Sequence, residues 1–204
     1  MAACRHQRSH AHPYTTSEPE NEERSGAYHH LYRRTRFGGH LTIAKDYAIT
    51  LAAETGQKVL LIEAGPGERD YQASEGLVDA GLKNSSPVQA IHSTKQNIST
   101  ARWLANEENR SNAGQVIHNV TFWSALLDVF DSIIIDAPSL QHSFEGVTLA
   151  TKADATVLVI QAESTPEPVI NNLRDTLNAA GAKLSGIVMN KRQYHIPAKI
   201  YKRL

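Results

Sequence analysis

Three polar residues stand where the chemistry of an α/β protein is usually found. Glu63, Asp136 and Asn190 each follow a short apolar run. In a parallel sheet, ligands bind beyond the carboxyl ends of the strands, so these side chains are candidates for one site. A carboxylate there can hold Mg²⁺ or orient an attacking water, and an asparagine amide can pair with a purine edge. The alternative is that Asp136 only caps the next segment and Glu63 is only solvated.

The elements that would position these residues alternate regularly along the chain. Apolar residues at helical spacing predict a helix over 43–55 that Gly56 closes, and a continuous apolar run predicts a buried strand over 58–63. Later patterns predict helices over 116–130, 144–152 and 164–180, and strands over 132–135, 155–161 and 184–189. This alternation predicts an α/β fold, a doubly wound parallel sheet with helices on both faces.

The stretch between residues 64 and 115 is polar and gives weaker signals. Residues 88–92 are typical of a short strand or a turn, and 98–104 of a strand. In the predicted helix 116–130, Val120, Trp123 and Leu126 share one face. We interpret the two tryptophans, Trp103 and Trp123, as core or half-buried anchors.

Composition excludes several classes of protein. The chain has 204 residues and a formal net charge of zero, which gives no electrostatic attraction to nucleic acid. The single cysteine, Cys4, cannot form an internal disulfide and fits a reducing compartment. The apolar runs are far shorter than the roughly 20 residues of a membrane span, and the N-terminus lacks the apolar core of a signal peptide. We therefore expect a cytoplasmic protein.

The first 40 residues have a composition of their own. They hold six of the ten histidines and no lysine, with few aliphatic residues and no apolar periodicity. These features favour disorder. We divide the chain into a disordered or out-of-frame segment over 1–41, an α/β domain over 42–193, and a basic tail with tyrosines over 194–204.

The strand motifs together resemble a known family, the bacterial tyrosine kinases of polysaccharide export. The motifs are Lys58-Val-Leu-Leu-Ile-Glu-Ala64, Phe130-Asp-Ser-Ile-Ile-Ile-Asp-Ala-Pro138, Ala153-Asp-Ala-Thr-Val-Leu-Val-Ile160 and Gly186-Ile-Val-Met-Asn-Lys-Arg192. The tail over 194–204 is similar to that of an exopolysaccharide branch of the family. The resemblance covers roughly residues 42–204 and implies a P-loop NTPase-like fold.

The resemblance also implies roles for individual residues. Asp136 takes the position of the Walker B aspartate, and Glu63 that of the first aspartate of a second acidic motif, which makes them the catalytic candidates. Asn190 takes the position of a base-contacting asparagine. The implied cofactors are ATP and Mg²⁺, with Asp136 and Thr42 as the metal ligands. The implied phosphate loop contains Gly38, Gly39 and Thr42.

The chain departs from the family at this phosphate loop. His40 stands where the family has its lysine, and Leu41 stands where it has a Mg²⁺-binding serine. Histidine is short and mostly neutral at pH 7, and leucine cannot ligate a metal. The loop is therefore degenerate, and ATP and Mg²⁺ binding is in doubt for this chain. In the tail, the resemblance makes Tyr194 and Tyr201 candidates for phosphorylation.

Members of the family also have a first strand before the phosphate loop. This sequence has no apolar run before its loop, so the resemblance leaves the first strand missing. Read one nucleotide later, codons for residues 28–41 can spell Ile-Ile-Thr-Phe-Ile-Gly, about four variable residues, then Glu-Gly-Thr-Ser. That is an apolar strand entering a glycine-rich loop. Our hypothesis is that residues up to about 41 are translated out of frame. The alternative is an unusual but genuine disordered tail.

Three functions are compatible with these observations. The first is a regulator of exopolysaccharide or capsular polysaccharide biosynthesis and export that resembles the tyrosine autokinase domain but has weak or no catalysis. Its partner would be a membrane chain-length regulator, a polysaccharide co-polymerase, which would hold it at the inner membrane; a homo-oligomer is also allowed. The second is an active ATP-dependent tyrosine kinase or ATPase. The third is a relative of the partition and division ATPases.

Overall fold

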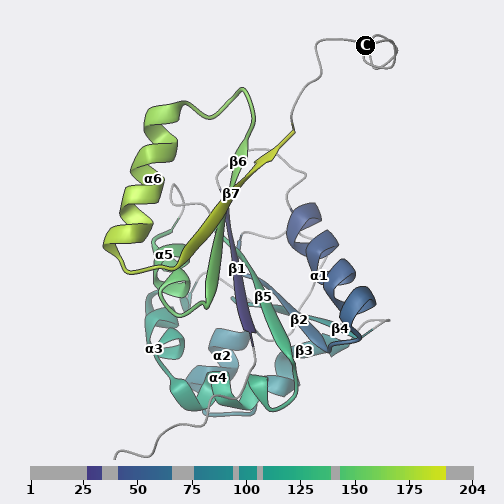
Figure 1. Ribbon diagram of the computed structural model, residues 1–204. Coiled ribbons are helices and arrows are strands. Elements are labelled where there is room, and N and C mark those ends of the chain that lie inside the picture. The colour runs from purple at the N-terminus through teal and green to yellow at the C-terminus, as the bar shows by residue number, and fades with distance from the viewer. Residues whose placement is uncertain are drawn as a thin grey trace, which may run out of the picture.

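A seven-stranded sheet with the order β3-β4-β2-β5-β1-β6-β7 forms the centre of the molecule (Figure 1). The computed structural model describes residues 27–33, 41–65, 76–93, 97–104, 108–138 and 143–191. All neighbouring strands are parallel except β3, which is antiparallel to β4. The strands are β1 (Ala27–Arg33), β2 (Val59–Glu63), β3 (Ile91–Ser93), β4 (Ile98–Arg102), β5 (Ser132–Ala137), β6 (Ala155–Gln161) and β7 (Leu184–Asn190).

Helices cover both faces of the sheet, as the sequence predicts. Helix α1 (Leu41–Thr55) lies on one face, where its alanines pack on apolar side chains of β2 and β5. The opposite face carries α2 (Leu77–Leu82), α3 (Ala113–Ile117), α4 (Val120–Leu127), α5 (Glu145–Ala150) and α6 (Glu167–Ala179), with 3₁₀ turns at Pro87–Ala90 and Arg110–Asn112. Figure 1 shows α1 standing apart from these helices across the sheet. The α/β layered architecture is therefore confirmed.

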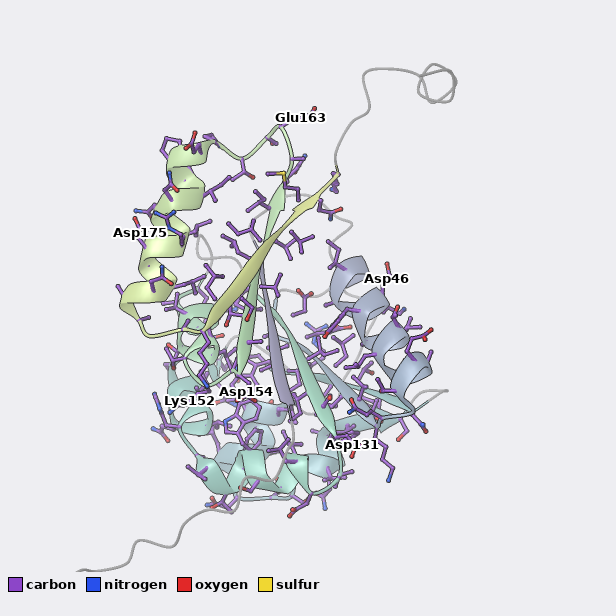
Figure 2. All side chains as sticks on the ribbon, viewed as in Figure 1. Asp46, Asp131, Lys152, Asp154, Glu163 and Asp175 are labelled. Atoms are coloured by element: carbon purple, nitrogen blue, oxygen red, sulfur yellow. The ribbon has the colours of Figure 1, made fainter. Side chains whose placement is uncertain are left out.

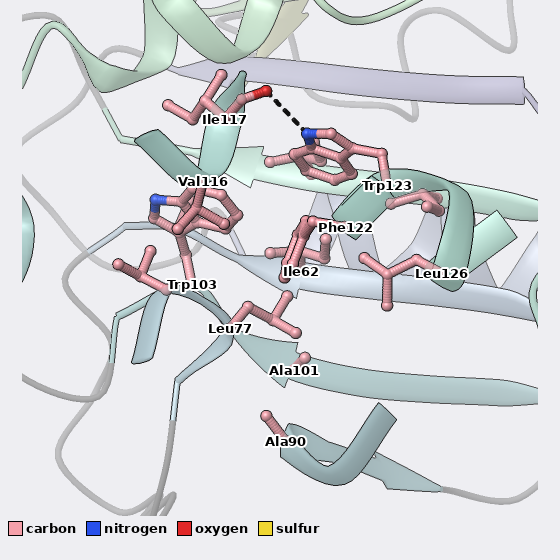
Figure 3. Close-up of a cluster of buried hydrophobic side chains, with 14 of the residues drawn as sticks. Ile62, Leu77, Ala90, Ala101, Trp103, Val116, Ile117, Phe122, Trp123 and Leu126 are labelled. Atoms are coloured by element: carbon pink, nitrogen blue, oxygen red, sulfur yellow. Dashed lines mark hydrogen bonds between the residues drawn. The ribbon is translucent and has the colours of Figure 1, made fainter. Parts of the chain in front are cut away.

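An aromatic cluster occupies the centre of the core on the α2–α4 face (Figure 3). Trp103 is fully buried and stacks on Trp123, with ring centroids 5.9 Å apart and an interplanar angle of 11°. The ring of Phe122 meets both tryptophans edge-on. The indole N–H of Trp123 donates to the carbonyl of Ile117 at 2.9 Å, which fixes α4 against the end of α3. The interpretation of both tryptophans as core anchors is confirmed.

The sequence predicted that the first strand of the fold is missing, but the structure contains it. Strand β1, at Ala27–Arg33, lies between β5 and β6 and pairs with both in parallel. The sheet thus includes residues from before position 42. Sequence patterning missed this strand because it contains two tyrosines, two histidines and an arginine, whereas a central parallel strand normally has an apolar run. Parallel pairing with β5 on one side and β6 on the other holds these residues in the sheet.

The single helix expected over 116–130 is in fact two helices. Helix α3 ends at Ile117 and α4 begins at Val120. Asn119 lies between them, and its side-chain oxygen accepts a hydrogen bond from the backbone N–H of Phe122 at 3.1 Å. An asparagine cap of this kind starts a new helix. The break rotates Val120 out of the core and leaves it 73% exposed, so its predicted place on the buried face is wrong.

Other sequence expectations have mixed outcomes. The strands expected near 58–63, 98–104, 132–135, 155–161 and 184–189 are all present, and glycines with positive φ, Gly56 at 71° and Gly181 at 81°, close α1 and α6. Residues 88–92 divide between a 3₁₀ turn and β3. The short helix α2 was not predicted. None of the helices in the described ranges is long and apolar enough to cross a membrane.

Candidate functional site

Two of the three predicted strand-end residues lie side by side. Glu63 at the end of β2 is in register with Asp136 near the end of β5. On its other side, Glu63 is in register with Arg102, the last residue of β4. Residues paired in register across parallel strands point to the same face of the sheet. Arg102, Glu63 and Asp136 therefore form one row, which we call the charged row.

The charged row faces helix α1. Leu61 and Ile134, two residues before Glu63 and Asp136 on their strands, pack with the α1 alanines in one core cluster. Side chains two apart on a strand share a face, so the charged row continues this face at the carboxyl edge of the sheet. Helix α1 runs antiparallel to the strands, which brings its first turn to the same edge (Figure 1). Asp131 and Asp154 mark the opposite edge (Figure 2).

Backbone hydrogen bonds hold the charged row in place. The N–H of Ala64 donates to the carbonyl of Asp136 at 2.9 Å, and the N–H of Trp103 donates to the carbonyl of Glu63 at 2.9 Å. These bonds continue the pairing of β4, β2 and β5 beyond the row. The row is thus fixed by the sheet itself rather than by a loop, which suits a site that needs defined geometry.

The carboxyl group of Glu63 has a shifted pKa. Partial burial raises the pKa of Glu63 above its ordinary value of 4.5, while the nearby charges of Arg102 and then Lys45 lower it. Burial has the larger effect, because a half-buried carboxylate loses water that the two cations only partly replace. Lys45, on α1, is therefore a fourth charged group of this edge.

The pKa shift of Glu63 makes protein stability depend on pH. Between pH 4.5 and the raised pKa, the folded chain binds more protons than the unfolded chain, so stability falls as the pH rises through this window. We expect Glu63→Gln to raise the melting temperature at pH 7 and to leave it nearly unchanged at pH 4. Glu54→Gln, on the exposed side of α1, is the control and should show no such difference. A Glu63→Gln variant that is less stable at pH 7 than at pH 4, relative to the parent, would contradict this prediction.

Asn190 does not join the charged row. It ends β7, which lies three strands from β5 across β1 and β6. Its side-chain oxygen accepts a hydrogen bond from the N–H of Lys191 at 2.8 Å, in a turn where Lys191 has a φ of 56°. Its backbone carbonyl accepts from Ala162 at 2.8 Å. Asn190 therefore closes the end of β7, and its role toward a base stays a prediction.

Several predicted site residues lie outside what the structure describes. Gly38, Gly39 and His40 precede α1, and Tyr194 and Tyr201 lie in the tail; all five are outside the described residues. Thr42 belongs to the first turn of α1. The degenerate phosphate loop and the tail phosphorylation sites stay predictions. Within the described ranges, no group of three or more His, Cys, Asp or Glu side chains could hold a metal ion.

Sequence reasoning missed two members of this edge, Arg102 and Lys45. Arg102 ends a strand in the same way as Glu63, so the strand-end rule that selected the acids would also have selected it. Lys45 lies four residues after Leu41, on the same face of α1. Its proximity to Glu63 depends on how α1 packs on the sheet, which no local pattern specifies.

Comparison with known proteins places this chain in a family. No family model matches the chain. Tyrosine-protein kinase CpsD from Streptococcus agalactiae is 31% identical over 163 residues, which are 75% of this chain and 70% of that protein. This chain belongs to the bacterial tyrosine-protein kinase family. Another relative of this kinase-family chain, the putative tyrosine-protein kinase CapB from Staphylococcus aureus, is 25% identical over 160 residues, 75% of this chain and 70% of that protein.

Several solved structures have the same fold as this kinase-family chain. The chimeric protein CapA2B2 superimposes with a TM-score of 0.69 at 20% identity, over 85% of this chain and 79% of that one. The septum site-determining protein MinD from Pyrococcus horikoshii, in complex with Mg-ADP, superimposes with a TM-score of 0.60 at 18% identity, over 86% and 76%. The P-loop NTPase fold expected from the strand motifs is thereby confirmed.

Proposed function

We propose that this kinase-family chain is a regulatory component of capsular or exopolysaccharide biosynthesis and export. It acts on the cytoplasmic side, where it docks on a membrane chain-length regulator and is held at the inner membrane through that partner. Its own catalysis is weak or absent. A homo-oligomer is compatible with this role.

One observation carries the proposal: a chain 31% identical to a tyrosine-protein kinase has Gly38-Gly-His-Leu-Thr42 where its family has a lysine and a serine. Phosphoryl transfer depends on positive charge and bound Mg²⁺ at the transferred phosphate. Removing one such group lowers turnover by roughly two to three orders of magnitude. The fold is retained, which supports a role in which a partner recognises the folded domain while its own chemistry is weak or absent.

A complementation experiment tests this proposal. Deleting the gene should reduce the amount or change the length of the exported polymer. Because docking is the function, a gene that carries Asp136→Asn should restore the polymer nearly as well as the parent gene. Asp154→Asn, at the opposite edge of the sheet (Figure 2), is the control for folding and expression.

The alternatives make different predictions for the same strains. If Asp136→Asn fails to restore the polymer while the variant is folded and abundant, the active tyrosine kinase is the better function. If the deletion leaves the polymer unchanged, the role in polysaccharide export is wrong. A relative of the division ATPases would instead show ATP-driven dimerisation, which sedimentation with and without ATP measures.

A further inference from the structure

Strand β7 leaves one edge of the sheet open. It pairs with β6 on one side, and no strand in the described part of the chain pairs with its other side (Figure 1). Its seven residues include no charged residue and no proline. Soluble proteins normally shorten, charge or cover such an edge, because its free N–H and C=O groups can pair with another chain. The opposite edge strand, β3, has only three residues, so β7 is the edge that needs a cover.

Two residues of β7 turn their backbone groups to this open edge. The carbonyl of Asn190 accepts a hydrogen bond from the N–H of Ala162, so the backbone of Asn190 faces β6. Successive residues of a strand face opposite neighbours, and the register with β6 is regular from Gly186 to the end of the strand. The N–H and C=O groups of Ile187 and Met189 therefore point away from β6.

The same two residues expose apolar side chains. Ile187 is 43% exposed and Met189 is 68% exposed. Their partners in register, Leu158 and Ile160 on β6, belong to the core cluster that includes apolar side chains of α6. Residues in register share a face of the sheet, so Ile187 and Met189 continue this apolar face to the open edge. A strand that pairs with β7 would satisfy its backbone groups and cover these side chains together.

The sequence that follows β7 has the pattern of such a strand. Residues 193–200, Gln-Tyr-His-Ile-Pro-Ala-Lys-Ile, lie outside the described residues. Apolar side chains occupy every even position of this segment, and polar side chains or proline occupy every odd one. Strict alternation of this kind is typical of a half-buried strand. Lys191, directly after β7, has a left-handed φ of 56°, so the extended strand ends there and the chain turns.

Side-chain pairing favours one register between this segment and β7. A four-residue connection, over 190–193, is a common length for an antiparallel hairpin. It places Tyr194 opposite Met189. Two residues further on, Ile196 lies opposite Ile187, so each exposed apolar side chain of β7 gains an apolar neighbour. A slip by one residue would turn the apolar side chains of the segment to the other face.

Pro197 independently favours the same register. It falls opposite Gly186, whose backbone faces β6 as that of Asn190 does. The backbone of Pro197 then points away from β7, so the pairing needs no N–H from the proline. On this outer side, the proline also prevents a further strand from pairing.

We propose that the segment after β7, beginning at Tyr194, pairs with β7 as an eighth, antiparallel strand and covers the open edge of the sheet within the same chain. A segment tethered by a short connection acts at an effective concentration on the order of millimolar, so it outcompetes a second copy of the chain for this edge. The proposal goes beyond the docking role in polysaccharide export and does not depend on it.

Amide hydrogen exchange of the full chain, measured by NMR, tests the pairing. The N–H groups of Ile187 and Met189 should be protected in the parent. Ile196→Pro removes an N–H that pairs with β7 and should speed their exchange by about tenfold or more, whereas Pro197→Ala should leave it unchanged. The N–H of Val188 faces β6 and is the internal control, since it should stay protected in both variants. Circular dichroism checks that each variant is folded.

Disulfide formation tests the register. In the proposed register, Val188 and His195 are opposite each other without direct hydrogen bonds, and Cα atoms in such a pair are about 4.5 Å apart, close enough for a disulfide. In a Cys4→Ser background, Val188→Cys with His195→Cys should form an intrachain disulfide in air. Val188→Cys with Ile196→Cys is the matched control, because position 196 points to the other face. Mass spectrometry without reductant measures both.

Three results would overturn the proposal. The first is fast exchange of the Ile187 and Met189 N–H groups in the parent chain. The second is equal cross-linking of the two cysteine pairs. The third is protection that is lost on dilution, which would assign this edge to a second copy of the chain. None of them touches the docking role in polysaccharide export, because that role is measured by polymer.

Discussion

Replacing residues 28–33 with Ile-Ile-Thr-Phe-Ile-Gly is expected to stabilise this protein by on the order of 5 kcal/mol. Strand β1 lies in the middle of the sheet, between β5 and β6, and pairs with residues such as Ile134 and Val157. A parallel strand in this position is covered on both faces and is normally apolar. Each fully buried apolar side chain contributes about 1.5–3 kcal/mol, whereas an unpaired polar group costs free energy there. Urea unfolding of the two proteins measures the difference.

This prediction also connects the structure to the reading-frame hypothesis. The residues that form β1 are those for which the shifted frame can give an apolar strand. Determining the codons of residues 28–41 tests it directly. If those codons do not give the apolar strand in the next frame, the hypothesis fails, whatever the engineered strand does to stability. An engineered strand that leaves the unfolding midpoint unchanged would show instead that β1 does not need an apolar sequence.

Trp103→Ala is expected to destabilise the domain by about 3–5 kcal/mol. Trp103 is fully buried between Trp123 and Phe122, so truncation removes a stacked contact and leaves a cavity that the sheet below cannot fill (Figure 3). The backbone of Trp103 also matters, since its carbonyl accepts from Val78 and holds α2. The same backbone is retained in the variant, so the measured loss reports on packing.

The control for this substitution is Val120→Ala. Val120 is 73% exposed at the start of α4, and its truncation should change stability by no more than about 0.5 kcal/mol. Chemical denaturation with tryptophan-independent detection, such as circular dichroism, compares the two. Equal losses for both variants would show that the aromatic cluster is not the centre of the core.

The parts of the fold that the sequence predicted are those with strong local signals. The strands β2, β5 and β6 are continuous apolar runs, and α6 has an apolar stripe that ends at a glycine. The parts that were missed depend on partners far away in the chain. Strand β1 has no apolar pattern and is defined by the edges of β5 and β6. The break before α4 depends on one asparagine within an otherwise helical pattern.

The candidate site divides in the same way. The sequence by itself determined that acidic residues end two buried strands, because alternation and strand length are local properties, whereas the absence of the family lysine stays a prediction from the resemblance. Only the tertiary structure decided that Arg102, Glu63 and Asp136 form one row and that the charge of Lys45 on α1 acts on Glu63. The strand order β4-β2-β5 joins segments up to 73 residues apart, as the bond from Lys58 to Asp131 shows. Such pairing is set by hydrogen bonds between strands and by helix packing, and neither is encoded in any single stretch of the chain.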